Sequence, residues 1–96
     1  MIKIVNIKQT CYACPSQWEG LDEDGKEVYI RFRHGTLRLD INNETIFSFE
    51  HPELDGVIEF DEVLDICKDH ICMNENAKEE HMSDPNEDYP YTEPNF

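Results

Sequence analysis

The alternation of apolar and polar residues between Val28 and Ile41 is the feature that most limits what this chain can fold into. It continues on both sides of His34–Gly35, and a period of two is typical of a hairpin with one buried face. Glycine and, to a lesser degree, histidine accept the positive φ angles of a tight two-residue turn. The pattern therefore predicts that Val28–Arg33 and Thr36–Ile41 are paired antiparallel strands.

A two-residue turn also fixes which residues of this hairpin face each other. The predicted pairs are Arg33–Thr36, Phe32–Leu37, Arg31–Arg38, Ile30–Leu39, Tyr29–Asp40 and Val28–Ile41. All apolar pairs then lie on one face, as a buried sheet face requires. The opposite face receives Arg31 directly across from Arg38.

A second hairpin is predicted upstream of the first. The segment Ser16–Leu21 leads into a turn over Asp22–Gly25, where glycine supplies a positive φ. A three-residue loop with a bulge at Gly25 buries Trp18, whereas a loop of two or four residues exposes Trp18 and buries Glu19. The three-residue loop is therefore favoured. Its pairs are Trp18–Ile30 and Gly20–Val28.

Two further strands complete the predicted sheet. Met1–Lys8 is short and β-branched, and its apolar residues of both parities indicate that parts of both faces are covered. Thr45–Phe49 continues the alternation, and a three-residue loop over 42–44 would place its two phenylalanines beside Leu39 and Leu37. The expected sheet is an antiparallel β-meander of four or five strands.

The C-terminal half of the sequence contains a predicted helix followed by a predicted irregular tail. Asp61 is a suitable N-cap for an amphipathic helix over 61–73 that covers the apolar sheet face. Its apolar stripe consists of Val63, Leu64, Ile66, Cys67 and Ile71. From Asn74 the sequence is rich in Asn, Glu, Asp and Pro without periodicity, which indicates a largely irregular acidic tail. We therefore expect one α+β domain over 1–73 and a tail over 74–96, in which Tyr89, Tyr91 and Phe96 are the residues suited to docking.

The charge of the chain is divided unevenly. Residues 1–43 are balanced, and residues 44–96 carry the whole net charge of −14. An acidic half repels nucleic acid and anionic membranes and attracts basic protein surfaces, although solubility alone also explains it. The sequence contains no apolar run of membrane-spanning length and no secretory signal. We expect a cytoplasmic protein that binds neither membranes nor nucleic acid directly.

The four cysteines permit a metal or redox site but do not favour one. Cys11 and Cys14 have the C-x2-C spacing of zinc knuckles and redox pairs, and Cys67, His70 and Cys72 form a second group. The two cysteines of the second group are five residues apart, which turns them away from each other on a helix. The segment after Cys14 lacks the helix start that a redox pair uses. Thiols in the core or on the surface are favoured, and we expect no metal and no cofactor.

The polar face of the predicted sheet is the candidate ligand-binding surface. Its side chains suit a nucleotide, and they are Gln17, Glu19, Tyr29, Arg31, Arg33 and Arg38. Guanidinium groups bind phosphate in a bidentate manner, while the tyrosine, glutamine and glutamate suit the base and ribose. Like charges directly opposite one another are destabilising, so Arg31 and Arg38 predict a nearby anion. That anion is either an internal carboxylate, such as Glu19, Asp40 or an acid of the tail, or a bound phosphate.

A sequence motif extends over much of this region. Pro15-Ser16-Gln17-Trp18-Glu19-Gly20, followed by Asp24-Gly25 and by Val28–Leu37, resembles short uncharacterised proteins of bacteriophages and bacterial mobile elements. Their pattern is P-S-Q-W-E-G, D-G, V-Y-I-R-Y-R and G-x-L, and here Phe32 replaces a tyrosine. The flanking cysteines are outside the pattern. The resemblance covers residues 15–38 and implies a phage setting, where small proteins often inhibit host systems or trap immune nucleotide signals.

No set of catalytic residues stands out, because the chain lacks G-x-S-x-G, H-E-x-x-H and a glycine-rich phosphate loop. We therefore expect a non-enzymatic, phage-encoded, counter-defence-like protein that captures a phosphate-bearing nucleotide on the arginine-rich sheet face. The alternative is an acidic inhibitor or DNA mimic that binds a basic host protein surface. A small phosphodiesterase-like hydrolase is a third option. The exposed sheet edges of so small a domain are also compatible with a homodimer.

Overall fold

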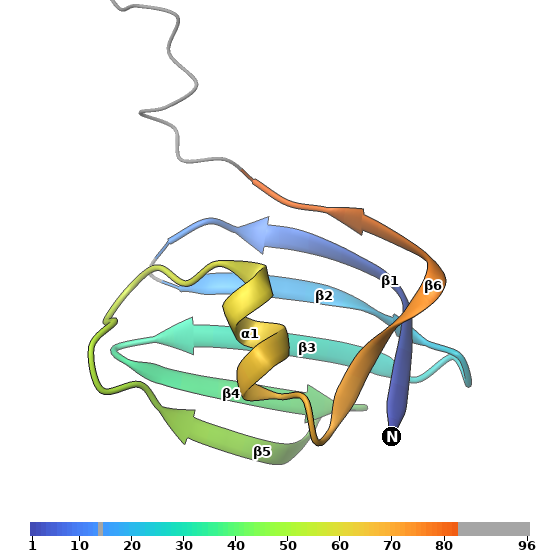
Figure 1. The fold of residues 1–96 in the computed structure, drawn as a ribbon, viewed down its shortest axis with the longest axis horizontal. Coiled ribbons are helices and arrows are strands. Elements are labelled where there is room, and N and C mark those ends of the chain that lie inside the picture. Colours follow the sequence, from blue (N-terminus) through green and yellow to red (C-terminus); the bar gives the residue numbers. More distant parts are fainter. Residues whose placement is uncertain (14, 83–96) are drawn as a thin grey trace, which may run out of the picture.

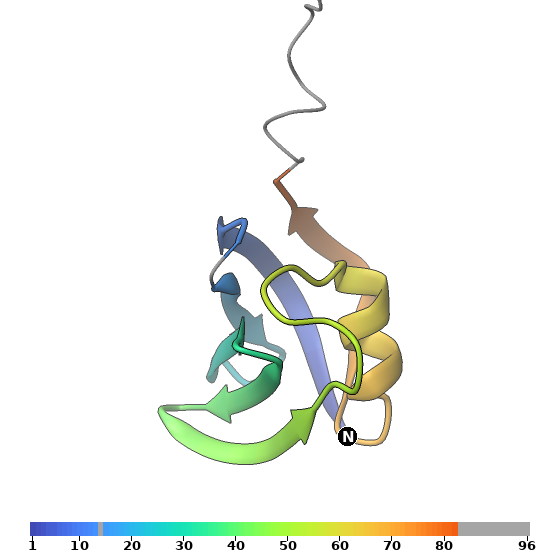
Figure 2. The same ribbon diagram turned by 90° about the vertical axis from the view of Figure 1, so that its left-hand side faces the viewer.

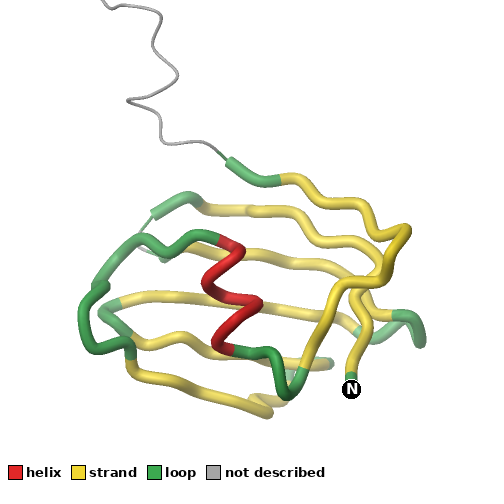
Figure 3. The backbone as a smooth tube through the Cα atoms, viewed as in Figure 1, coloured by secondary structure: helices red, strands yellow, loops and turns green. Residues whose placement is uncertain are grey.

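The structure, a computed structural model, describes residues 1–13 and 15–82. Six strands form one mixed sheet in the order β5-β4-β3-β2-β1-β6, and helix α1 lies on one of its faces (Figures 1 and 3). The elements are β1 (Ile2–Cys11), β2 (Ser16–Asp22), β3 (Glu27–Arg33), β4 (Thr36–Ile41), β5 (Glu44–Glu50), α1 (Phe60–Ile66) and β6 (Ile71–Glu80). Within these residues, no helix has the length and apolar character needed to span a membrane.

The two central hairpins have the predicted registers. All six predicted pairs between β3 and β4 occur, and the turn residues His34 and Gly35 have φ angles of 52° and 80°. β2 pairs with β3 so that Trp18 lies opposite Ile30, and Gly25 has a φ angle of 79°. The α+β class is confirmed, whereas the predicted meander of four or five strands is matched only in part: β1 to β5 are antiparallel neighbours, but a sixth strand pairs in parallel with β1 and makes the sheet mixed.

The phenylalanines of β5 have the predicted neighbours, but the turn before them is shorter than predicted. Phe47 lies opposite Leu39, and Phe49 lies opposite Leu37. The turn consists of only Asn42–Asn43, with φ angles of 50° and 67°, values that asparagine tolerates better than most residues. A register shift after Leu39 then compensates for the missing loop residue.

The apolar residues of both parities in β1 have a different cause from the one predicted. The pairing with β2 shifts register between Ile4 and Asn6, which is the pattern of a β-bulge. The extra residue reverses the alternation, so that Ile4 and Ile7 are both buried in the same core. The bulge therefore changes which residues of β1 face the core, odd-numbered or even-numbered. This change explains the apolar residues of both parities without coverage of both faces of the strand.

Helix α1 is shorter than predicted and begins earlier. Its N-cap is Glu59, whose side chain makes no capping hydrogen bond, and it ends at Ile66 rather than at residue 73. Asp61 lies in its first turn and is not the N-cap. The early start places Phe60 in the core against Trp18, with ring centroids 5.4 Å apart. The burial of Phe60 thus outweighs the preference for an aspartate cap.

The irregular tail predicted from Asn74 onward is wrong for residues 74–80. These residues belong to β6, which pairs in parallel with β1 and begins with Ile2 opposite Ile71. β6 provides hydrogen-bonding partners for an edge of β1 that would otherwise be open. The expected domain boundary after residue 73 therefore falls inside a strand. Residues 83–96, with Tyr89, Tyr91 and Phe96, lie outside the described part of the chain.

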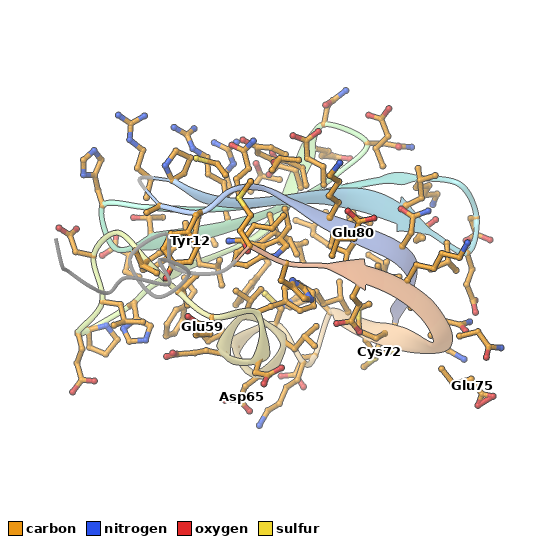
Figure 4. The ribbon with its side chains drawn as sticks, turned by 90° about the horizontal axis from the view of Figure 1, so that it is seen from above. Tyr12, Glu59, Asp65, Cys72, Glu75 and Glu80 are labelled. Carbon is orange, nitrogen blue, oxygen red and sulfur yellow. The ribbon has the colours of Figure 1, made fainter. Side chains whose placement is uncertain are left out.

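The core lies between α1 and the sheet, which curves toward the helix (Figure 2). Its buried apolar residues are Ile4, Ile7, Trp18, Val28, Ile30, Phe32, Leu37, Leu39, Ile41, Ile58, Phe60, Val63, Cys67 and Ile71. The connection between β5 and α1 runs past the β3–β4 turn at one end of the sheet (Figure 1) and is held by polar contacts, among them a hydrogen bond from Gly35 N to Asp55 O at 2.8 Å. His51 Nε2 lies 2.5 Å from Glu62 Oε2, and Ser16 Oγ accepts a hydrogen bond from Ile58 N at 3.3 Å. Within the described residues, the opposite face of the sheet carries no helix (Figure 4).

A candidate anion-binding face of the sheet

The face of the sheet opposite α1 carries the arginines. Arg31 lies directly across from Arg38, and on its other side it lies across from Gln17. Figure 4 shows side chains tipped with nitrogen projecting from this face, away from the helix. The predicted register thus brings Gln17, Arg31 and Arg38 into one row across β2, β3 and β4.

Asp40 neutralises part of the arginine pair. Its Oδ1 lies 3.2 Å from Arg38 Nε and accepts a hydrogen bond from Thr45 Oγ1 at 2.7 Å. The approach of Arg38 is an ion pair without hydrogen-bond geometry, because Arg38 Nε has no hydrogen-bond partner within the described residues. The same guanidinium lies over the Tyr29 ring, 5.7 Å from its centroid. An internal carboxylate therefore accounts for Arg38 only.

Arg31 and Arg33 form no ion pair within residues 1–13 and 15–82. Arg31 Nε is also buried without a hydrogen-bond partner there. A shallow depression of about 300 Å³ lies between these side chains. It is lined by Arg31, Arg33, His34, Thr36 and Arg38, and its lining includes no carboxylate. The depression is thus a concentration of positive charge on a chain whose net charge is −14.

The other three predicted site residues are joined in a hydrogen-bond network beside this depression. Tyr29 Oη donates to Gln17 Oε1 at 2.8 Å, and Gln17 Nε2 donates to Glu19 Oε2 at 3.2 Å. Thr10 Oγ1 accepts from Gln17 Nε2 at 3.0 Å and donates to Glu19 Oε2 at 3.2 Å. None of these residues lines the arginine depression. Glu19 and Tyr29 instead line a neighbouring depression of about 370 Å³.

The P-S-Q-W-E-G segment is divided between the two faces of β2. Ser16 and Trp18 are buried toward α1, whereas Gln17 and Glu19 belong to the polar network. Gly20 is required by the bulge of β1, because a Cβ atom at this position would lie 2.0 Å from Asn6 O. Three of the six motif residues, Ser16, Trp18 and Gly20, therefore have a structural explanation, and two, Gln17 and Glu19, border the arginine depression.

Of the cysteines in the described part of the chain, Cys11 and Cys72 lie far apart. Cys72 pairs with Lys3 near the start of β1, and Cys11 is the last residue of that strand. Eight residues of strand separate these positions by roughly 25 Å. Cys67 is buried in the core, and its burial raises the pKa of the thiol to about 11. Cys11 therefore cannot share a metal ion with Cys72, and Cys14 lies outside the described residues.

Comparisons of the chain with protein-family models, curated proteins and solved structures found no match. The case for a function consequently rests on the residues and on their geometry. Sequence reasoning found the arginine row because the register of a tight hairpin is readable from its alternation. It did not single out Asp40 as the partner of Arg38, because Glu19 and the acids of the tail were equally available.

Proposed function

We propose that this protein binds a phosphate-bearing small ligand, such as a nucleotide, on the face that carries Arg31, Arg33 and Arg38. The observation that carries the proposal is the depression lined by these three arginines and by no carboxylate. In a chain with twenty-two acidic residues, internal ion pairs would be the expected fate of three arginines. Only Arg38 has such a pair among the described residues.

The chemistry of the depression fits phosphate. A phosphate group between Arg31 and Arg38 would accept charge-assisted hydrogen bonds from both guanidinium groups. It would also remove the repulsion between two like charges that face each other. Arg33, which is exposed at the end of β3, would add a third cation at the rim. Binding thus supplies the counter-charge that the fold leaves missing.

The neighbouring depression supports a nucleotide rather than phosphate alone. Tyr29 lines it and is contacted by Arg38, which lines the arginine depression, so the two depressions adjoin. Glu19 and Glu27 line the second depression and would repel a phosphate from it. Their carboxylates would accept hydrogen bonds from base amino groups or ribose hydroxyls. The ligand would therefore lie with its phosphate on the arginines and its nucleoside toward Tyr29.

A thermal-shift titration tests this proposal. The full chain would be titrated with inorganic phosphate, AMP, ATP and cyclic di-AMP, since a ligand of the folded state raises Tm by mass action. At about one hundred times Kd the expected stabilisation is about 2.7 kcal/mol. Arg31→Ala should abolish the shift. Lys26→Ala, which removes an exposed cation from the β2–β3 turn, should preserve it.

Two outcomes would count against the proposal. One is the absence of any shift with all four compounds at millimolar concentration. The other is an equal shift for the Arg31→Ala and Lys26→Ala variants. Chromatography of the titrated ligand separates binding from the hydrolase alternative, because turnover would convert the nucleotide and binding would return it unchanged.

The acidic-inhibitor alternative has its own supporting observation. β6 is an edge strand, and its Glu75, Glu79 and Glu80 side chains are exposed. Such a surface favours association with a basic protein that weakens as salt rises. Capture of a host protein that is lost at high salt and retained by Arg31→Ala would favour this alternative over nucleotide binding.

A further inference from the structure

A second concave site lies at one end of the sheet, on the opposite side from the arginines. It is formed where β1 ends, α1 begins and β6 ends, and its volume is about 200 Å³. Six of its lining residues are aromatic or acidic, namely Tyr12, Trp18, Phe60, Glu59, Asp61 and Glu79. Figure 4 shows Tyr12 and Glu59 at this end of the molecule. We refer to it as the aromatic–acidic pocket.

The three carboxylates of this pocket have no cationic partner among the described residues. Its lining includes neither lysine nor arginine. Glu59 and Asp61 form no ion pair in that part of the chain. His81 also lines the pocket, but Trp18 Nε1 donates a hydrogen bond to His81 Nδ1 at 3.1 Å. The ring proton must then lie on Nε2, which faces Glu79 Oε1 at 3.0 Å, so that the imidazole is neutral.

Two aromatic residues of the pocket, Trp18 and Phe60, are buried and pack against each other. The Phe60 ring lies 5.4 Å from the Trp18 ring and 4.7 Å from the His81 ring, centroid to centroid. Trp18 is further fixed by its hydrogen bond to His81, and the backbone N–H of Met82 donates to Gln9 Oε1 at 2.7 Å. Aromatic side chains beside carboxylates can attract an organic cation.

The geometry excludes a bare metal ion as the preferred ligand. Among the described residues, no three acidic, histidine or cysteine side chains are grouped closely enough to hold a metal. The volume of about 200 Å³ also exceeds the roughly 30 Å³ that one water molecule occupies. It is smaller than the roughly 300–1,000 Å³ of sites for drug-sized ligands. One side chain with a charged end fits these limits.

We infer that the aromatic–acidic pocket binds a single alkylammonium group, which a lysine side chain of a partner protein would supply. The ammonium group would lie between the carboxylates of Glu59 and Asp61, and its alkyl chain would lie against Tyr12 and Phe60. This site differs from the arginine face in position and in the sign of its charge. The inference therefore stands or falls independently of nucleotide binding.

The single tryptophan of the chain provides the measurement, because Trp18 lines the pocket. Nα-acetyl-lysine-N-methylamide represents a lysine side chain, and choline represents a free ammonium compound. Uncharged 3,3-dimethyl-1-butanol has the shape of choline without its charge. Each would be titrated into the full chain while Trp18 fluorescence and the 15N–1H signal of its indole are recorded. We expect saturable changes with the lysine derivative at a Kd on the order of 1 mM.

The matched variants remove acids inside and outside the pocket. Glu59→Gln together with Asp61→Asn should weaken binding about threefold to tenfold. Asp65→Asn, on the side of α1 that points away from the sheet, should leave Kd unchanged (Figure 4). A response to choline with none to the lysine derivative would contradict binding of a lysine side chain and would indicate a small ammonium compound as the ligand. Equal responses to choline and to the uncharged alcohol, or no response in either signal, would overturn the inference.

Discussion

Arg31 and Arg38 face each other across the β3–β4 hairpin, and among the described residues only Arg38 has a carboxylate within ion-pair distance. The hairpin buries Ile30, Phe32, Leu37 and Leu39 on its other side. The register that buries this apolar set also forces the two arginines together, because side chains alternate strictly along a strand. The repulsion is thus a consequence of the packing that stabilises the core.

Replacing Arg31 with glutamine should therefore leave the free protein as stable as before, or more stable by about 0.5 kcal/mol. The substitution removes a like-charge pair and retains a polar side chain. The overall negative charge opposes this gain only weakly, since exposed charges more than about 10 Å apart are screened at 0.1 M salt. Urea unfolding at low phosphate would measure the difference. A loss above about 1 kcal/mol would show that Arg31 has a stabilising partner.

Gly20→Ala should be among the most damaging single substitutions. The added Cβ would lie 2.0 Å from Asn6 O in the bulge of β1, and both atoms belong to paired strands that cannot separate freely. We expect a loss of about 3 kcal/mol in the free energy of unfolding. Gly25→Asn is the matched control, because nothing lies within 4 Å of its Cβ position and asparagine accepts a positive φ. Equal losses for both variants in urea titrations would contradict the close-contact explanation.

The parts of the fold that were predictable depend on local rules. Alternation and turn length determine the register of a hairpin, and the β2–β3–β4 pairing follows from Trp18, Gly25 and His34–Gly35. The candidate ligand-binding residues on that face were predictable for the same reason. The aromatic–acidic pocket was not, because it needs β6 beside β1, and no local pattern in Asn74–Glu80 indicates a strand.

The missed elements depend on contacts between distant segments. Ile71 fits the apolar stripe of a helix that continues from Val63, yet it lies in β6 because Ile2 offers a parallel partner. The bulge in β1 could not be predicted from the sequence either, because its apolar pattern is the same as that of a strand covered on both faces. In each case the competing factor is an unpaired strand edge or a close backbone contact, which single-strand patterns do not report.

The chain ending at Met82 should be much more stable than the chain ending at Met73. The shorter chain loses the pairs that Lys78, Glu79 and Glu80 form with β1, and it also loses the His81 acceptor of the Trp18 indole. At roughly 1 kcal/mol for each lost hydrogen bond, the difference should be at least about 3 kcal/mol. Urea unfolding of the two chains measures it. Equal stabilities would contradict the prediction, because they would mean that residues 74–82 do not stabilise the sheet.

Cys67 should make the protein lose stability at alkaline pH. Burial raises the pKa of its thiol from the ordinary value of 9.0 to about 11, so the folded state holds this proton more tightly than the unfolded chain. The stabilisation is complete below pH 9 and is lost as the pH rises to 11, by up to about 3 kcal/mol. Cys67→Ala should be less stable at pH 7 because of its cavity, but its free energy of unfolding should fall less steeply between pH 9 and 11. Lysines and tyrosines titrate in both proteins, so the difference between the two urea-unfolding series isolates Cys67, and parallel pH profiles would contradict the prediction.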